Sequence, residues 1–532
     1  MADTLVDNVN GITLDAKGEV KRFTALLIGD DGRVEQVLER GDKTPGKVDY
    51  RVDGKGRVML PGMIDSHAHV IQLGFSTMIL DLSEAKSLGE AQSRLAAWSA
   101  ANPDQPWILG FGWNEERWGL GRFPTAAELD AVVSNRPVWL MRADGHAGWA
   151  NTAALSAAGI TSATKAPDGG RIERLAGGTK PSGVLVNAAT TLVERHVTPP
   201  RPKDRDLAFR AAQELLLKRG ITAVADMGTS IEDWQTYRRA GDNGALRMRI
   251  MAYADGIDAM VLIAGPGPTP WLYDDRLRLN GVELSVDGAL GSRGAALKAP
   301  YADSAANAGL LLLGETKLRN LMSRAAMDNF QVAVHAAGDR ANALALDAIE
   351  ELSTSYKGDR RWRIEHAQVI DPTDIPRFGR HGIFASMQPT HQASGRQMAE
   401  ARLGPARLAG AYAWKSVAAA GAQLAFGSDA PMEAPNPFAG MAAAITRQDA
   451  EGQPFGGWQP QEAISREAAL AAYTADGARA GFADGRFGRL TKGQRADFIF
   501  VDHDPLLVTA AQLRGIKVLQ SWVGGQLVHD AN

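Results

Sequence analysis

Five residues of metal-binding type stand at the ends of apolar segments of the chain. They are His67 and His69 after GMIDS, His335 after QVAV, His366 after WRIE, and Asp429 after QLAFGS. Imidazole and carboxylate groups bind zinc and related divalent cations. The chain contains no cysteine, which excludes a thiolate metal site, a cysteine nucleophile and a disulfide framework. The pattern therefore indicates a metal site of nitrogen and oxygen ligands.

The positions of these residues strengthen the interpretation. Side chains two apart on a strand face the same side, so His67 and His69 can meet one cation. Two surface histidines would give the same spacing, and the pair alone is weak. However, His335, His366 and Asp429 each end a predicted strand of their own, at the edge where the side chains of a parallel barrel converge. Ten histidines scattered at random would seldom give this arrangement.

A further carboxylate lies on the segment GVELSVDG, where strict alternation places Glu283, Ser285 and Asp287 on one face. If that face points inward, Glu283 can bridge two cations. An exposed charge or a hydrogen-bonding group would give the same pattern. We therefore expect one or two metal ions per chain.

The ligand types suit zinc, which we expect, and also manganese, iron or nickel. Such a cation lowers the pKa of a bound water to about 7 and so supplies hydroxide at neutral pH. Asp429 then has two candidate roles, as a ligand and as the catalytic group that accepts the proton and relays it to the leaving group. The chemistry that this pattern favours is hydrolysis.

The elements that must hold these residues alternate between helix, glycine and apolar strand, the pattern of βα units around a parallel sheet. Eight strands are predicted, the number needed for a closed (β/α)8 barrel. Their segments are GMIDSHAHV, ITAVADMG, LRMRIMAYAD, NGVELSVDG, QVAVHAAGD, RWRIEHAQ, IFASMQP and QLAFGSDAP. We assign residues 59–484 to this α/β barrel.

The two ends of the chain differ from this middle region. Short strands with Asp-Gly turns dominate residues 1–58, and residues 485–532 have similar strand-turn-strand segments. We therefore expect one small β-sandwich domain built from both ends.

The first two barrel strands are separated by roughly 140 residues, several times the usual connection length. We interpret residues 85–200 as an inserted α+β subdomain at the edge where barrel enzymes keep their active sites. Three tryptophans of this insert could line an apolar pocket, although tryptophans more often belong to a core. They are Trp113, Trp118 and Trp149. His146 could contact substrate or stabilise a turn.

Three other polar residues are candidate substrate contacts. Asp287 shares the face of Glu283, while Arg293 and Arg340 lie just beyond the ends of the fourth and fifth strands. The two arginines could bind a substrate carboxylate, and ion pairs between loops are an equally good interpretation.

Together these residues resemble the amidohydrolase superfamily over nearly the whole chain. PGMIDSHAHV is similar to its first-strand metal motif, and His335, His366 and Asp429 match its ligands on strands 5, 6 and 8. The phrases DGALGSR, HAAGDRAN, RIEHAQV, MQPTH and FGSDAPME resemble the YtcJ-like branch, amidohydrolase family 3, which includes N-substituted formamide deformylases.

The resemblance implies a distorted barrel, a β-sandwich made from both chain ends, an insertion that contains His146, and hydrolysis by metal-activated hydroxide. It also implies a homodimer. Many members carry a carbamylated lysine on strand 4 that bridges two metals. Here the corresponding residue is Glu283. Its carboxylate could bridge two metal ions directly, but its side chain is shorter than a carbamylated lysine. A site with one metal ion is therefore a serious alternative to a site with two.

We expect an enzyme that cleaves a C–N amide-type bond of a small molecule, an N-acyl or N-formyl compound. The alternative is a deaminase or a cyclic-amide hydrolase with a single metal. A third and weaker hypothesis is a regulatory protein that binds metal without catalysis, because such a role needs no water-activating carboxylate.

The composition of the chain limits the kinds of partner that we expect the protein to bind. The formal net charge is −3, which gives no electrostatic reason to expect nucleic acid. No apolar run approaches the roughly 20 residues that span a bilayer. The first residues lack a basic stretch followed by an apolar one, and we expect a cytoplasmic protein, although a cysteine-free chain suits the periplasm equally.

Overall fold

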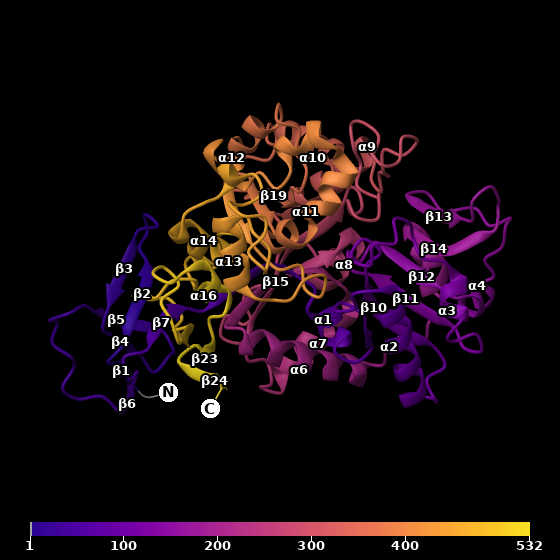
Figure 1. The fold of residues 1–532 in the computed structure, drawn as a ribbon. Coiled ribbons are helices and arrows are strands. Elements are labelled where there is room, and N and C mark those ends of the chain that lie inside the picture. Colours follow the sequence, from indigo (N-terminus) through magenta and orange to yellow (C-terminus); the bar gives the residue numbers. More distant parts are fainter. Residues whose placement is uncertain (1–2, 532) are drawn as a thin grey trace.

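A sheet of eight parallel strands occupies the centre of the computed structural model, which describes residues 3–531 (Figure 1). The order of the strands along the sheet is their order in the sequence. The eight predicted strands and the barrel are therefore confirmed. The strands are β8 (Met63–Ala68), β15 (Ile221–Thr229), β16 (Arg249–Asp255), β17 (Leu277–Ser285), β18 (Gln331–Ala336), β19 (Arg363–His366), β20 (Phe384–Met387) and β21 (Gln423–Phe426).

The barrel closes through the chain that follows β21. Within the described residues β21 and β8 form no ladder. Instead the backbone N–H of Asp429 donates to the carbonyl oxygen of His67 at 2.7 Å, and that of His69 donates to Ala430 at 2.8 Å. Because these hydrogen bonds replace a regular strand ladder, the barrel is distorted, as expected. They also bring the first and last strands together at the predicted metal site.

Helices cover the outside of the barrel and turn buried apolar residues toward it. In α10 (Asp339–Leu352) the buried residues include Ala341, Ala345, Leu346 and Ile349, the three- and four-residue spacing of a single helix face. The other helices that follow or precede barrel strands are α1 (Val70–Ser76), α6 (Pro202–Lys218), α7 (Ile231–Asp242), α8 (Gly256–Ala264), α9 (Glu315–Met327), α11 (Pro389–Leu403), α12 (Trp414–Ala419) and α13 (Pro437–Thr446). No helix in the described part of the chain has the length and apolar character needed to cross a bilayer.

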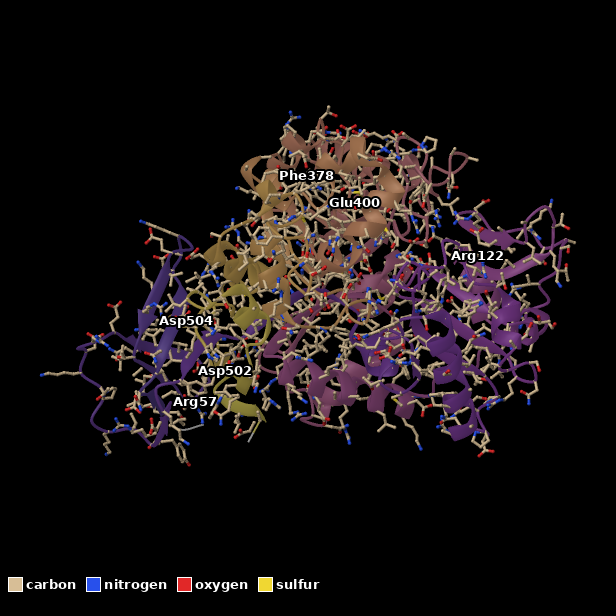
Figure 2. The ribbon with its side chains drawn as sticks, in the orientation of Figure 1. Arg57, Arg122, Phe378, Glu400, Asp502 and Asp504 are labelled. Atoms are coloured by element: carbon tan, nitrogen blue, oxygen red, sulfur yellow. The ribbon has the colours of Figure 1, made fainter. Side chains whose placement is uncertain are left out.

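The two chain ends form one β-sandwich, as predicted, and Figure 1 shows indigo and yellow strands side by side. An ion pair of 2.8 Å between Arg22 and Asp504 also joins the ends, and Figure 2 labels Asp504. One sheet contains β1 (Thr4–Asp7), β4 (Ala25–Ile28), β5 (Val34–Leu38) and β6 (Tyr50–Asp53). The other contains β2 (Asn10–Leu14), β3 (Val20–Phe23), β7 (Val58–Pro61), β22 (Phe498–Val501), β23 (Val518–Val523) and β24 (Gln526–Asp530).

The insertion after β8 is an α+β subdomain on the side of the barrel away from the sandwich (Figure 1). Its sheet begins before position 85, where we expected the insert to start, because Leu80 and Asp81 pair with Gly110 and Phe111. The strands are β9 (Leu80–Asp81), β10 (Ile108–Trp113), β11 (Val138–Arg142), β12 (Ala147–Ala150), β13 (Gly170–Arg174) and β14 (Pro181–Asn187). Its helices include α2 (Leu88–Ala101), α3 (Ala126–Asp130) and α4 (Thr152–Ala157).

A buried ion pair connects the barrel to the sandwich. The Arg249 side chain on β16 and that of Asp497 just before β22 are 1% and 3% exposed. Arg249 Nη2 donates to Asp497 Oδ1 at 2.7 Å, and the same guanidinium donates to the carbonyl oxygens of Asp274 and Asp275. A buried charge of this kind depends on its partner, since desolvation costs several kcal/mol when the partner is lost.

We therefore predict that Asp497→Asn destabilises the protein by about 3 kcal/mol or more, because Arg249 would stay buried without a counter-charge. The midpoint of urea unfolding, followed by circular dichroism, measures the effect. Asp30→Asn is the matched control, since Asp30 is exposed on the same sandwich. Equal midpoints for Asp497→Asn and wild type would contradict the prediction.

Candidate metal centre

His69 is held at the barrel mouth by the neighbouring strand β15. It is the residue before α1, and its Nδ1 lies 2.9 Å from the carbonyl oxygen of Met227. Asp226 accepts the backbone N–H of Val70 at 2.7 Å, which fixes the start of α1. A carbonyl can only accept, so Nδ1 carries the proton and Nε2 points to Asp429 Oδ1 at 3.1 Å.

His67 is oriented by a buried carboxylate, Glu365. The His67 side chain is 1% exposed and that of Glu365 is fully buried, and Nδ1 lies 2.8 Å from Glu365 Oε2. Arg363 donates to both oxygens of Glu365, at 2.7 and 3.1 Å. Burial alone would raise the pKa of Glu365, but Arg363 and His67 lower it to about 2. The carboxylate thus leaves His67 Nε2 facing the site, 3.6 Å from Asp429 Oδ1.

His366 turns into the site through an unusual backbone conformation. Its φ is 69°, which a residue with a side chain rarely adopts and which costs on the order of 1 kcal/mol or more. Nδ1 lies 2.9 Å from Gln388 Oε1. The ring centroid is 4.7 Å from that of His67 and 4.4 Å from that of His335. Burial and the nearby His67 lower the pKa of His366 to about 3, so the ring is neutral.

His335 carries the clearest sign of a missing partner. It is 6% exposed, and its Nε2 has no hydrogen-bond partner among the described residues. The nearest carboxylate oxygen, Asp287 Oδ1, is 3.8 Å away. Burial and the neighbouring imidazoles hold the pKa of His335 well below its usual range. A buried, neutral imidazole nitrogen without a partner fits a metal ligand.

Asp429 supplies the carboxylate of the centre. Burial opposes its ionisation, but the hydrogen bond from His69 and the adjacent His67 and His366 hold its pKa well below the usual range. Its φ is 60°, again a left-handed conformation. The residues present therefore fit a divalent cation, since ligand atoms of His67, His366 and Asp429 all lie within 4.8 Å of one another.

Glu283 lies beside this group at the end of β17. It is partly buried, and we find no hydrogen bond or ion pair to its carboxylate from any described residue. Its Oε2 would lie 3.5 Å from a Cβ atom at Gly228. Burial raises the pKa of Glu283, and the nearby His67 and His69 oppose the rise. The carboxylate thus faces the imidazoles of the first strand, and a bridging role stays a prediction.

Two of the candidate substrate contacts are engaged elsewhere. Trp113 is 0% exposed within the core of the insert, where its indole N–H donates to the carbonyl oxygen of Leu140 at 2.8 Å. Trp118 and Trp149 pack in the same core. The Asp287 carboxylate accepts backbone N–H groups from three residues at 2.8 to 2.9 Å: Ala296, Ala337 and Gly338.

The three other candidates differ from one another. Arg293 forms an ion pair of 2.7 Å with Asp303, and its guanidinium lies over the ring of Phe123. Arg340 is exposed at the start of α10. Of these three, His146 reaches the metal centre, with its ring centroid 5.2 Å from that of His335.

Two residues of the site were not predicted. Glu365 directly precedes His366, and His391 Nε2 lies 3.5 Å from Asp429 Oδ2. Strand alternation places Glu365 inside the barrel beside Arg363, and His366 faces the same space only because of its positive φ. The signal for both lay in the phrases RIEHAQV and MQPTH, which contain a carboxylate and an imidazole with no stated role.

The Glu365 contact predicts an effect on metal affinity. Glu365→Gln removes the charge that orients His67, and we expect metal binding about 10- to 100-fold weaker. Competition with a chromogenic chelator measures it. Glu39→Gln, at an exposed position of the sandwich, makes the same chemical change as a control. Wild-type affinity in Glu365→Gln would show that the contact does not support the metal.

His69 predicts that metal binding releases a proton. Burial lowers the pKa of His69, but the hydrogen bond and charge of Asp429 outweigh it and raise the pKa to about 9. The metal-free ring is therefore protonated at neutral pH, whereas a cation needs the neutral ring. From this group we expect zinc affinity to rise about tenfold per pH unit up to about pH 9 and then level off. Calorimetric titration in two buffers of different ionisation enthalpy measures the release, and no net release at neutral pH would contradict it.

Comparison with known proteins identifies the family. The sequence profile of the amidohydrolase family matches residues 51–529. YtcJ of Bacillus subtilis, whose name assigns it to the amidohydrolases, is 32% identical over 89% of this chain and 89% of its own length. The N-substituted formamide deformylase of Arthrobacter pascens is 27% identical over 100% of this chain and 99% of its own. A solved metal-dependent hydrolase of Pyrococcus horikoshii, 26% identical, superposes with a TM-score of 0.74 over 96% of this chain and 99% of that one. The chain therefore belongs to the amidohydrolase family and is a metal-dependent hydrolase of its YtcJ-like branch.

Proposed function

We propose that this hydrolase cleaves a C–N amide-type bond in a small molecule, an N-acyl or N-formyl compound. The observation that carries the proposal is the position of Asp429 between two imidazoles. Its Oδ1 lies 3.1 Å from His69 Nε2, and its Oδ2 lies 3.5 Å from His391 Nε2. A buried carboxylate kept ionised in this way is suited to take and return a proton.

The metal would be held by His67, His69, His335, His366 and Asp429, with Glu283 as an additional ligand if two cations bind. Zinc is the cation that we propose. When bound, it would polarise the substrate carbonyl and lower the pKa of water to about 7.

The roles of the protein groups follow from their positions. Asp429 accepts the proton of the attacking water and passes it to the departing nitrogen, so that the amine leaves neutral. The proton needs an acceptor near the reacting atoms, and Asp429 is ionised and lies at the barrel mouth. Glu365 and Met227 hold His67 and His69 in the tautomers that turn Nε2 toward the site.

The deformylase of Arthrobacter pascens supports the amide class, because its name states removal of formyl groups from N-substituted formamides. The other candidate function is deamination or cyclic-amide opening at a single metal. It is supported by the tight group of His67, His366 and Asp429 and by the absence of a lysine on β17. Elemental analysis separates them, since two metals per chain favour the amide hydrolase and one favours the alternative.

The proton-transfer role predicts that Asp429→Asn keeps metal but loses nearly all turnover, by a factor of about 100 or more. The amide has the same size but cannot accept the proton. The measurement is kcat on an N-substituted formamide together with metal content. Asp104→Asn, an exposed change in the insert, is the control. Turnover of Asp429→Asn above about a tenth of wild type would exclude the role.

A further inference from the structure

The inserted subdomain reaches the barrel mouth through one tight turn. The turn joins the antiparallel strands β11 and β12 and ends at His146. Gly145 adopts a φ of +69°, and its N–H donates to the carbonyl oxygen of Arg142 at 2.9 Å. Asp144 Oδ1 accepts the backbone N–H of His146 at 3.1 Å. The conformation of the turn is thus fixed from within, and the place of His146 with it.

The same turn is also fixed from outside, by segments that leave two different barrel strands. After β17, the backbone N–H of Ser292 donates to Asp144 Oδ2 at 2.9 Å. After β21, the Met432 side chain packs so closely that a Cβ atom at Gly145 would lie 2.5 Å from its Cε. The turn is therefore seated against the loops that follow Glu283 and Asp429.

Buried ion pairs hold the turn in that seat. The Arg142 side chain is 4% exposed and donates to Glu115 at 2.9 and 3.0 Å and to Asp144 at 2.7 Å. On the barrel side, Arg402 of α11 is 1% exposed and donates to Glu116 and to the carbonyl oxygen of Gly291. Arg142 ties Asp144 to Glu115 within the insert, whereas Arg402 connects the insert to the barrel, since separating the two would take Glu116 from a buried charge.

This seat places the His146 imidazole next to the metal centre. Its ring centroid lies 5.2 Å from that of His335, and the residue is only partly buried. Asn187 supports it from the insert, since its backbone N–H donates to the carbonyl oxygen of His146 at 2.8 Å and its amide interacts with the imidazole.

Asn187 is a buried residue with an unusual backbone conformation. It is 6% exposed with a φ of 51°, and neither amide atom has a well-formed hydrogen bond to any described residue. The side chain fills the space left by two glycines of the β17 exit loop, because a Cβ atom at Gly288 or Gly294 would lie within 2.8 Å of it. A strained, buried and poorly bonded amide beside an active-site ring indicates a positioning role.

We infer that the insert supplies His146 as a substrate-contacting residue that donates a hydrogen bond to the oxygen of the scissile carbonyl, with Asp144 and Asn187 as its positioning residues. The inference rests on the proposed amide hydrolysis. Negative charge develops on that oxygen as water attacks, and a donor fixed beforehand in a site sheltered from water stabilises it. His146 meets the requirement because the barrel and the insert both fix its position before substrate binds.

The first test compares His146→Ala with His196→Ala, which removes an exposed histidine of the same insert. We expect kcat/KM on an N-substituted formamide to fall about 100-fold in His146→Ala and to stay at wild type in His196→Ala. His146→Gln keeps a side-chain N–H donor and should recover part of the loss. Metal content and thermal unfolding should match wild type in all three.

The second test measures binding without turnover. Acetohydroxamate, a small carbonyl compound that binds metal centres, is titrated into the zinc-loaded proteins by calorimetry. We expect the Kd to rise about tenfold or more in His146→Ala and not in His196→Ala. An unchanged Kd, or a loss of zinc from His146→Ala, would overturn the inference, the latter because His146 would then be a metal ligand.

These two tests also separate the inference from the proposed function. If wild type binds acetohydroxamate but hydrolyses no amide, the proposed function fails, and the Kd of His146→Ala still decides whether the insert contacts a carbonyl ligand. A wild-type protein that neither hydrolyses amides nor binds acetohydroxamate would overturn both.

Discussion

The closure of the barrel between its last and first strands is the constraint on which the site depends. Asp65 on β8 accepts both the backbone N–H and the hydroxyl of Ser428, at 2.9 and 2.5 Å, and the next residue, Asp429, donates its N–H to His67. A Cβ atom at Gly427 would lie 2.5 Å from the His67 backbone nitrogen, so the two segments approach as closely as glycine allows. Asp429 meets His67 and His69 only because these contacts exist, and without them the carboxylate would leave the imidazoles.

The charges in this small space give the imidazoles different protonation states. His69 next to Asp429 has its pKa raised to about 9, whereas burial and neighbouring rings lower the pKa of His366 to about 3. Like charges a few ångströms apart in a buried site cannot all ionise. His335 and His366 are therefore already in the neutral form that binds metal, and His69 must lose a proton. Burial lowers the pKa of His67, but Glu365 and Asp429 outweigh it and raise the pKa, which favours the protonated ring there too. Arg363 compensates the charge of Glu365 through their buried ion pair, so the carboxylate can orient His67 without becoming protonated.

Features that depend on the period and position of residue types were predictable from the sequence, whereas features that depend on individual backbone torsions were not. The barrel strands were visible because glycine and apolar runs alternate with helical segments, and the ligands were visible because they end those runs. The role of Glu365 was not predictable because regular alternation would turn His366 away from it, and residue types do not reveal a φ of 69°. Asp287 was expected on the face of Glu283, but β17 ends at Ser285, and beyond it the carboxylate turns to backbone N–H groups of the next loops. The backbone conformation at the end of a strand thus determines whether a polar side chain points to the substrate or bonds to neighbouring backbone groups.

The barrel and the insert are suited to different roles because their residues are held in place in different ways. A metal centre needs ligands held to within tenths of an ångström, and the strand ends of a closed barrel provide them. Substrate recognition needs a group above the metal, where a single loop would be mobile. Here the turn at His146 is pinned to two strand exits, by Ser292 and by Met432, and its withdrawal would separate the buried Arg402 from Glu116. Under the inference made for His146, the insert can vary in its apolar core while the turn keeps its position, so that the choice of substrate is separate from the chemistry of the metal.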